Sequence, residues 1–451
     1  MNKRGKCLIF FTIFLLLFSF SLFAAGEKET EAAEEEGTAV KIEEGSWDWL
    51  KEAAKPHEGT MLRMVSLNAT WAEVAKSFLP EFEEMTGIKV LYEPMPFQTI
   101  HEKQVAAMAG GTGEFDVLCF DNPWASEYAN AGWLEPLDPY VEKYGYDLDW
   151  PDTLLDYYSL DGNLIAIPYE VDARMIFYRK DLFEKYDVPL PDTIDELEDA
   201  ARVLNQPENG HYGIAFAPAR SIVSVLEYFA FLRAYGGSVF DSEMKPTINS
   251  DAAVTALEKY VGLLEYAPPG GQNMQWDELL TVMLQGKVAM SIQPSPFGRT
   301  MNDPAQSKVV GKVGFLIHPK AEKRVPSIGG WAIGIPKDCK NKEAAWLLTA
   351  YLTSPEIEKK RALHSGGSVP GRLSTLSDPE VVAEEPSMKV TGESLEVAQF
   401  GNKWQIPEWA QVQDALTLAI ANAATGEKSV KAALDEAQET IYDIMEEAGY
   451  Y

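Results

Sequence analysis

Cysteine, histidine and basic side chains are scarce in this 451-residue chain. It has 3 cysteines and 5 histidines, and no two histidines stand at the spacing of a metal-binding helix. We therefore expect no transition-metal site and no cofactor. Lys and Arg number 39 against 69 Asp and Glu, which gives a net charge of −30 at pH 7. Because polyanions need a basic partner face, this balance argues against DNA, RNA and anionic membrane surfaces, and it favours a soluble monomer.

Long apolar runs are also missing, except at the N-terminus. There, three basic residues within positions 3–6 precede the uncharged segment Cys7–Phe23 and the small residues Ala24, Ala25 and Gly26. This order is typical of an export signal that is cleaved near Gly26. An uncleaved anchor is the alternative, although the run is slightly short for a membrane span. We predict that residues 1–26 are a signal peptide and that the protein is exported to the periplasm or another extracytoplasmic space.

Two cysteines, Cys119 and Cys339, remain once the signal is removed. An oxidising compartment would allow a disulfide. Cys119, however, lies within an apolar strand-like run, and Cys339 comes where a helix begins. We therefore expect two buried, unpaired thiols.

The chain is too long for a single ordinary core, and two domains are expected. Hydrophobic residues make up 46% of it, enough for globular cores. Residues 27–59 differ from the rest: 27–44 are rich in Glu and predict a solvated tether, and 46–56 predict a leading helix. Folded structure is expected from about Thr60.

Beyond Thr60, apolar strand-like runs alternate with segments of helical periodicity. This alternation predicts an α/β fold with a parallel sheet covered by helices on both faces. In such sheets ligands sit beyond the carboxyl ends of strands. Three segments fall there: "NATW" at 68–71, "PMPFQ" at 94–98 and "DNPW" at 121–124.

Several stretches together resemble the extracellular solute-binding proteins of carbohydrate-type ABC importers, family 1, the broad class of maltose-binding protein. They include "FDVLCFDNPWASEYANAGWLEPLD", "IPYEVDARMIFYRKDLFEKYDVPLPDTIDELEDAARVLN", "QGKVAMSI", "GGWAIGIPKDCKNKEAAWLLTAYLTSPE" and "GGSVPGRLSTLSDP". The matching pieces span most of residues 60–444 in the family's order. In the second stretch, Asp192 or Thr193 is expected to cap a helix.

The resemblance implies a two-lobed periplasmic-binding-protein fold of type II, with a hinge between lobes that are each a mostly parallel sheet flanked by helices. Lobe one is expected at 60–169 plus 292–328, and lobe two at 170–291 plus 329–451. The resemblance also implies a small carbohydrate or polyol in the interlobe cleft, and a membrane ABC permease as a transient partner. The solute itself stays open, including acidic sugars.

The stretch "SIGGWAIGIPKDC" raises a specific question, because two glycines precede Trp331. We expect Gly329 and Gly330 to let the backbone bend so that the indole faces the cleft as a ligand platform. A core tryptophan is the alternative.

A sugar cleft needs flat aromatic surfaces and a few directed hydrogen-bonding groups. In "YEVDAR" three polar side chains share one side of an extended strand by period-two alternation. A solvated edge with a salt bridge is the alternative for these three. A turn with a capping Asp and a packed Trp is the alternative for "DNPW", and core packing is the alternative for Trp71. The family resemblance implies that Ser295, Phe297 and Arg372 face the ligand. The predicted ligand-binding residues are Asn68, Trp71, Asp121, Asn122, Trp124, Glu170, Asp172, Arg174, Ser295, Phe297, Trp331, Arg372 and Trp404.

No nucleophile elbow, phosphate loop or zinc-protease motif is present in the sequence. The chain is therefore expected not to be an enzyme, and no catalytic residue is assigned. Two alternatives to a receptor stay open at this point: a secreted glycoside hydrolase that uses paired carboxylates, and a cell-surface adhesin.

Overall fold

The computed structural model describes residues 42, 45–399 and 406–451, and the predicted signal and Trp404 lie outside them. The first group of elements packs around one hydrophobic core. It comprises α1 (Asp48–Ala54), β1 (Met61–Leu67), α2 (Thr70–Lys76), α3 (Leu79–Thr86), β2 (Lys89–Met95), α4 (Phe97–Ala109), β3 (Val117–Asp121), α5 (Ala125–Asn130), α6 (Asp138–Tyr144), α7 (Asp152–Tyr157) and the hairpin β4 (Ser159–Leu160) and β5 (Asn163–Leu164).

A 13-residue strand, β6 (Ile167–Arg179), then leads into a second group. This group comprises α8 (Lys180–Tyr186), α9 (Ile194–Leu204), β7 (Tyr212–Ala215), α10 (Ile222–Ala234), α11 (Asp251–Gly262), α12 (Trp276–Leu284), β8 (Val288–Pro294), α13 (Gly298–Met301) and β9 (Val313–Ile317). Its buried side chains form two further clusters.

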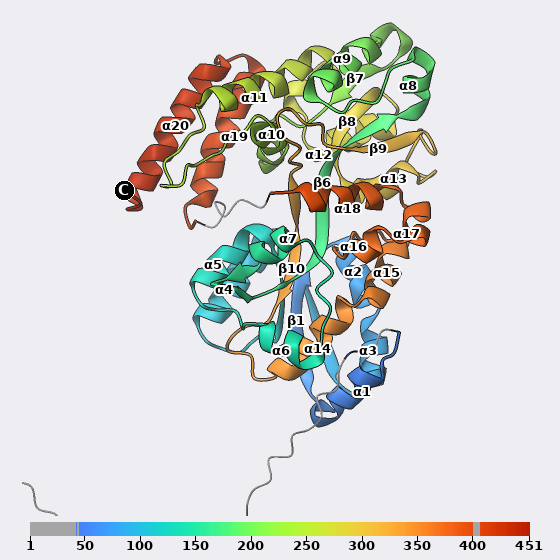
Figure 1. Ribbon diagram of the computed structural model, residues 1–451, viewed down its shortest axis with the longest axis vertical. Coiled ribbons are helices and arrows are strands. Elements are labelled where there is room, and N and C mark those ends of the chain that lie inside the picture. The colour runs from blue at the N-terminus through green and yellow to red at the C-terminus, as the bar shows by residue number, and fades with distance from the viewer. Residues whose placement is uncertain (1–41, 43–44, 400–405) are drawn as a thin grey trace, which may run out of the picture. The chain divides into compact units, whose positions relative to one another are not determined.

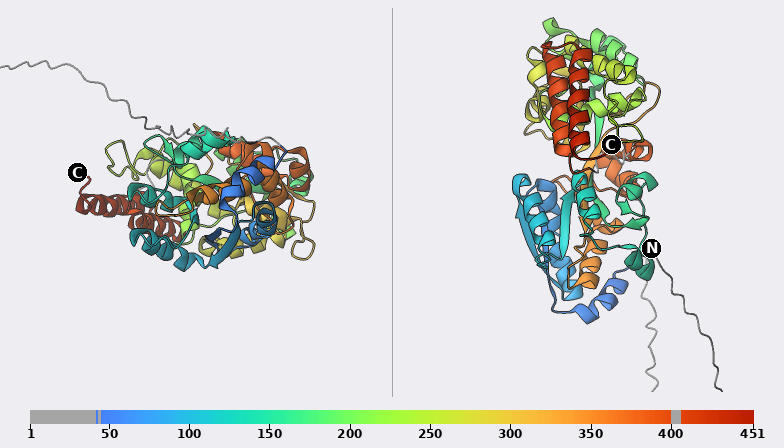
Figure 2. Two further views of the ribbon diagram at one scale, coloured as in Figure 1. Left: turned by 90° about the horizontal axis from the view of Figure 1, so that it is seen from below. Right: turned by 90° about the vertical axis from the view of Figure 1, so that its left-hand side faces the viewer.

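The chain returns to the first core through β10 (Ile328–Gly334). It continues there with α14 (Lys342–Leu352), α15 (Pro355–Leu363), α16 (Leu373–Leu376), α17 (Pro379–Glu384) and α18 (Ser387–Val397). Finally α19 (Trp409–Thr425) and α20 (Val430–Glu447) join the second core, where they lie side by side (Figure 2). We call the elements around the first core the first lobe and those around the other two clusters the second lobe.

This packing differs from the lobe boundaries expected from the sequence. Residues 331–395 pack in the first core, whereas 292–317 pack with the second lobe. The strand β9 explains part of the difference, since it pairs with the second-lobe half of β6, with Phe315 opposite Phe177. The first crossing lies within β6, where Val171 belongs to the first core and Ala173 to the second lobe.

The strands follow the order β2-β1-β3-β10-β6-β8-β7, and β9 also pairs with β6. Figure 1 labels β6 and β10, the two strands that run between the lobes. The outer pairs are parallel, as the alternation of strands and helices predicts. The central strand β10 is antiparallel to both of its neighbours, β3 and β6. The sheet is therefore mixed, because β6 and β10 carry the chain between the lobes in opposite directions.

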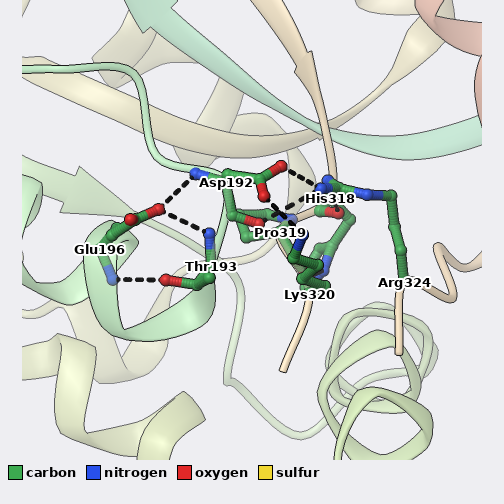
Figure 3. A network of polar contacts seen from close by, with 7 residues as sticks. All are labelled: Asp192, Thr193, Glu196, His318, Pro319, Lys320 and Arg324. Carbon is green, nitrogen blue, oxygen red and sulfur yellow. Dashed lines mark hydrogen bonds and ion pairs between the residues drawn. The ribbon is translucent and has the colours of Figure 1, made fainter. Parts of the chain in front are cut away.

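Local sequence signals explain several helix boundaries. Thr193 caps α9, where its hydroxyl accepts a hydrogen bond from the backbone N–H of Glu196, whose carboxylate in turn accepts one from the N–H of Thr193. The preceding Asp192 pairs with Lys320 at 2.7 Å and with Arg324, and these contacts tie the start of α9 to the chain after β9 (Figure 3).

Cys119 and Cys339 are both buried and unpaired. Across the described residues, no helix is long and apolar enough to span a membrane.

Candidate functional site

A pocket of about 800 Å³ lies between the two lobes. The first lobe lines it with the ends of β1 and β3, the start of α4 and α7. The second lobe contributes the first turns of α10 and α12 and the segment after β8, and the crossing strands β6 and β10 contribute the residues at the hinge. The volume is within the range of small-molecule sites, about 300–1,000 Å³.

The two glycines before Trp331 are explained by their neighbours on β6. Gly330 has φ +146°, and a Cβ atom there would lie 2.2 Å from the carbonyl oxygen of Glu170. A Cβ atom at Gly329 would lie 2.9 Å from the Asp172 carboxylate. Glycine is therefore required at 330 for the close approach of β10 to β6, and at 329 it leaves room for a carboxylate at the pocket wall.

Trp331 lies against the pocket and is 9% exposed. Three aromatic rings surround its indole: the ring centroids of Trp71, Phe97 and Trp124 lie 5.8, 6.2 and 5.5 Å away. Two of these contacts are edge-to-face. The result is an aromatic wall built from β10, α2, α4 and the turn after β3. Such a wall offers flat apolar surface to a ligand.

Two carboxylates stand next to this wall. Asp121 is opposite Trp331 in the pairing of β3 with β10, and Asp172 is opposite Gly329 in the pairing of β6 with β10. Burial and then the charge of Asp172 raise the pKa of Asp121 to about 7. Asp121 Oδ1 accepts a hydrogen bond of 2.9 Å from the backbone N–H of Asn122. Both side chains border the pocket and can accept hydrogen bonds from hydroxyl groups.

Arg174 is a buried cation that lines the pocket. Its side chain is 2% exposed, and its Nη1 lies 3.8 Å from Asp172 Oδ1. The guanidinium stacks over the indole of Trp276 at 4.9 Å from the ring centroid. A second arginine, Arg233 of α10, also lines the pocket, and burial lowers its pKa to about 10. Carboxylates and guanidinium groups thus face the same space.

Glu170 lines the pocket, but its carboxylate is already engaged. Oε2 accepts hydrogen bonds from Arg361 at 2.9 Å and from the Ser368 hydroxyl at 2.6 Å, and Oε1 accepts one from the Val369 backbone N–H at 2.7 Å. These bonds fasten the segment after α15 to β6. These bonds occupy both carboxylate oxygens of Glu170, whereas Asp121 and Asp172 also line the pocket.

The structure brings most of the predicted site residues together. Those that line the one pocket are Trp71, Asp121, Asn122, Glu170, Asp172, Arg174, Phe297 and Trp331. Trp124 supports the wall from behind through its ring contact with Trp331. Trp404 lies outside the described residues.

Three predicted residues do not line this pocket. Asn68 is exposed and lies outside its lining. Ser295 is buried, and its hydroxyl accepts a hydrogen bond from the Ala173 backbone N–H. Arg372 is 1% exposed and is held inside the first lobe by the carbonyl oxygens of Thr353 and Asp147 and by the Trp150 ring at 4.4 Å. We therefore leave these three out of the proposed site.

Sequence reasoning missed several lining residues, chiefly Phe97, Tyr157, Arg233, Trp276 and Gln399. Phe97 lies in the segment 94–98, which the expected strand order had placed at the ligand edge. Trp276 carried a usable signal, since a tryptophan as the first residue of an acidic helix turn is poorly placed for a core. Arg233 and Gln399 carried no such signal, because their positions depend on how the second lobe faces the first.

Comparison with known proteins agrees with this architecture. The family model described as "Bacterial extracellular solute-binding protein" matches residues 66–359. The chain belongs to this family. It is 30% identical to the mannitol-binding protein of Pseudomonas aeruginosa over 78% of this chain and 85% of that protein. It is 27% identical to a probable amino-acid ABC transporter periplasmic-binding protein of Sinorhizobium fredii, over 88% and 92% of the two chains.

Among solved structures, the solute-binding protein of an ABC transporter from Agrobacterium radiobacter K84, in complex with ribitol, superposes with a TM-score of 0.73. That protein is 29% identical, and the match covers 86% of this chain and 99% of the other. The chain thus has the two-lobed fold that the sequence resemblance implies.

Proposed function

We propose that this extracellular solute-binding protein captures a sugar or polyol between its lobes and delivers it to an ABC permease. The single observation that carries the proposal is the pocket at the crossing strands β6 and β10. There an aromatic wall around Trp331 stands beside the carboxylates of Asp121 and Asp172 and the guanidinium of Arg174.

This combination matches the chemistry of a polyhydroxylated ligand. The C–H surfaces of a sugar pack on aromatic rings, and its hydroxyl groups both donate to carboxylates and accept from arginine. The relatives named for mannitol and ribitol support the same ligand class. Another relative is named for amino acids, and amino acids therefore belong among the controls.

The proposed ligand contacts are Trp71, Asp121, Asn122, Asp172, Arg174, Phe297 and Trp331. Binding would favour a closed arrangement of the lobes, because a ligand that touches both stabilises the state in which they approach. The permease would then recognise the closed form. The sequence signal at residues 1–26 and the name of the family support export, and we propose cleavage near Gly26.

A thermal-shift screen of the protein without residues 1–26 tests the proposal. D-mannitol, ribitol, D-glucose, maltose and several amino acids would each be added at millimolar concentration. A ligand in hundredfold excess over its Kd stabilises the folded state by about 2.7 kcal/mol, which raises the melting temperature visibly. If only amino acids raise it, or if no compound does, the sugar or polyol proposal fails.

The same preparation separates a receptor from a glycoside hydrolase. A receptor returns labelled maltose and longer oligosaccharides unchanged, while its small-angle scattering shows compaction with ligand. Steady release of glucose would instead support an enzyme that uses the pocket carboxylates.

A further inference from the structure

Arg174 combines deep burial with unused hydrogen-bonding capacity. It is 2% exposed and borders the pocket, yet its Nε and Nη1 atoms have no hydrogen-bond partner among the described residues. The carboxylate at Asp172 is 3.8 Å from Nη1, which is too long for a hydrogen bond. Leaving a buried charged donor unpaired is costly, so these donors are available to a ligand that supplies acceptor atoms.

The Trp276 indole is the contact that orients this guanidinium. The Arg174 guanidinium carbon lies 4.9 Å from the indole centroid, and Phe297 packs edge-on against the same indole at 6.2 Å. Trp276 is the first residue of α12, and the helix start is fixed because the Gln275 backbone N–H donates to the Glu278 carboxylate at 3.1 Å. The indole therefore helps to set the plane of a guanidinium whose Nε and Nη1 have no hydrogen-bond partner among the described residues.

The neighbouring aspartate indicates what the ligand must offer. Asp172 Oδ1 is buried and also has no hydrogen-bond partner within the described part of the chain. A hydroxyl group can accept from Arg174 and donate to Asp172 at the same time, whereas a carboxylate can only accept. A ligand carboxylate would also add a negative charge close to Asp121 and Asp172.

We propose that Arg174 and Trp276 act as one unit that reads a pair of adjacent hydroxyl groups, with Trp276 as the positioning residue for the guanidinium. The inference rests on the proposed function and adds to it a specific discrimination: the site selects neutral vicinal diols against the sugar acids that share their carbon skeleton. Trp276 contributes to ligand affinity indirectly, because it orients the N–H groups that Arg174 donates to the ligand.

Matched ligand pairs test the discrimination by isothermal titration at pH 7.5 and fixed ionic strength. The pairs are D-glucitol with D-gluconate and D-glucose with D-glucuronate, in which a CH₂OH group is exchanged for a carboxylate. In any pair that binds, we expect the neutral member to bind at least about tenfold more tightly, or about 1.4 kcal/mol. Equal or tighter binding of the acid overturns the inference while leaving a receptor function intact. If neither pair nor any compound of the wider screen binds, the proposed function falls, and the inference falls with it.

A double-mutant cycle tests the positioning role with the best neutral ligand of the screen. Trp276→Leu should weaken binding by roughly 3- to 30-fold, the range expected from loss of a cation–π contact. Trp276→Phe should recover part of this loss, because it keeps an aromatic face. In an Arg174→Gln background, Trp276→Leu should change the affinity by less than about twofold, since no guanidinium remains to be oriented.

Equal losses in both backgrounds would show that the indole acts directly on the ligand or on the fold, and would overturn the positioning role. Trp133→Leu, a tryptophan substitution outside the pocket lining, is the matched control and should leave the affinity unchanged. Arg174→Lys keeps the charge but not the planar fork, and should lose as much affinity as Arg174→Gln. Melting curves of all variants confirm that they are folded. Should Trp276→Leu fail to fold, Trp276→Phe measured in the wild-type and in the Arg174→Gln background completes the same cycle.

Discussion

Arg361 Nη2 lies 2.9 Å from Glu170 Oε2, and neither side chain is more than 4% exposed. The same nitrogen donates to the Tyr169 carbonyl oxygen, and the guanidinium lies 4.0 Å from the Tyr169 ring centroid. This buried pair joins α15 to β6 directly beside the point where β6 leaves the first core.

We predict that Arg361→Met destabilises the protein by about 3–5 kcal/mol, because it leaves the Glu170 carboxylate buried without its cation. Urea unfolding at pH 7.5 measures the loss. Lys360→Met is the matched control on the same helix: Lys360 pairs with Glu81 and Glu356 at the surface, and its removal should cost less than about 1 kcal/mol. Equal losses for the two variants would contradict the assigned role.

Substitutions at the two glycines of β10 should have different effects, one mainly on stability and the other mainly on ligand binding. Gly330→Ala forces a side chain into a positive φ and against the Glu170 carbonyl oxygen, and should lower the unfolding free energy by at least about 1–3 kcal/mol. Gly329→Ala meets only the Asp172 carboxylate, which can shift. We expect it to weaken ligand binding with a smaller change in stability. The melting temperature and the ligand affinity of both variants test this. A larger loss of stability in Gly329→Ala than in Gly330→Ala would contradict the prediction.

Ligand affinity should depend on pH through Asp121. Because burial and Asp172 raise its pKa to about 7, Asp121 gains a proton as the pH falls through 7 and then loses its charge as an acceptor. We expect up to about tenfold weaker binding at pH 6 than at pH 8. Asp121→Asn should bind more weakly at pH 8 and show no such dependence, whereas Asp277→Asn, on the facing wall, should keep it. A wild-type affinity that is constant from pH 6 to 8 would contradict this assignment.

Acid should destabilise the second lobe through His318. Burial lowers the pKa of its imidazole to about 4, from about 6.5 in an unfolded chain. Between these values the unfolded state binds more protons than the folded state, so the contribution of His318 to stability is lost as the pH falls from 6.5 towards 4. The shift corresponds to at most about 3 kcal/mol.

His318→Gln tests this sign. The difference in unfolding free energy between the wild type and the variant should shrink as the pH is lowered across that interval. Leu190→Ala, which removes an exposed side chain that does not titrate, should show a pH-independent difference. If the difference from the wild type varies with pH in the same way for both variants, protonation of His318 does not destabilise the folded state.

The sequence predicted the fold class and the outer strands because local patterns specify them. Thr193, one of the two N-cap candidates, caps α9, and "DNPW" follows β3 where that strand meets the pocket. The position at which the chain returns to the first lobe was harder to predict, because "GGWAIGIP" has the pattern of a buried strand that could belong to either lobe. Its place between β3 and β6 is fixed by the fit of Gly330 against Glu170 and by the register of Trp331 with Asp121, neither of which has a local signature.

The pocket residues also differ in whether a local sequence pattern predicts their position. Those that follow a strand or share its face, such as Asp121 and Arg174, could be predicted from alternation and strand order. Arg372 looked equally suitable in its loop, but Asp147, Thr353 and Trp150 engage it inside the first lobe. Trp276 reaches the pocket because the first turn of α12 lies against the second-lobe half of β6, where its indole contacts Arg174.

The pairing of β6 with β10 continues from one lobe into the other, with a shift of register between Trp331 and Ala332. A change in the angle between the lobes would therefore change backbone torsions at residues such as Asp172 and Gly329, which pair with each other and also line the pocket. A substitution at these residues would therefore change two properties together: the shape of the ligand pocket and the resistance of the two connecting strands to bending.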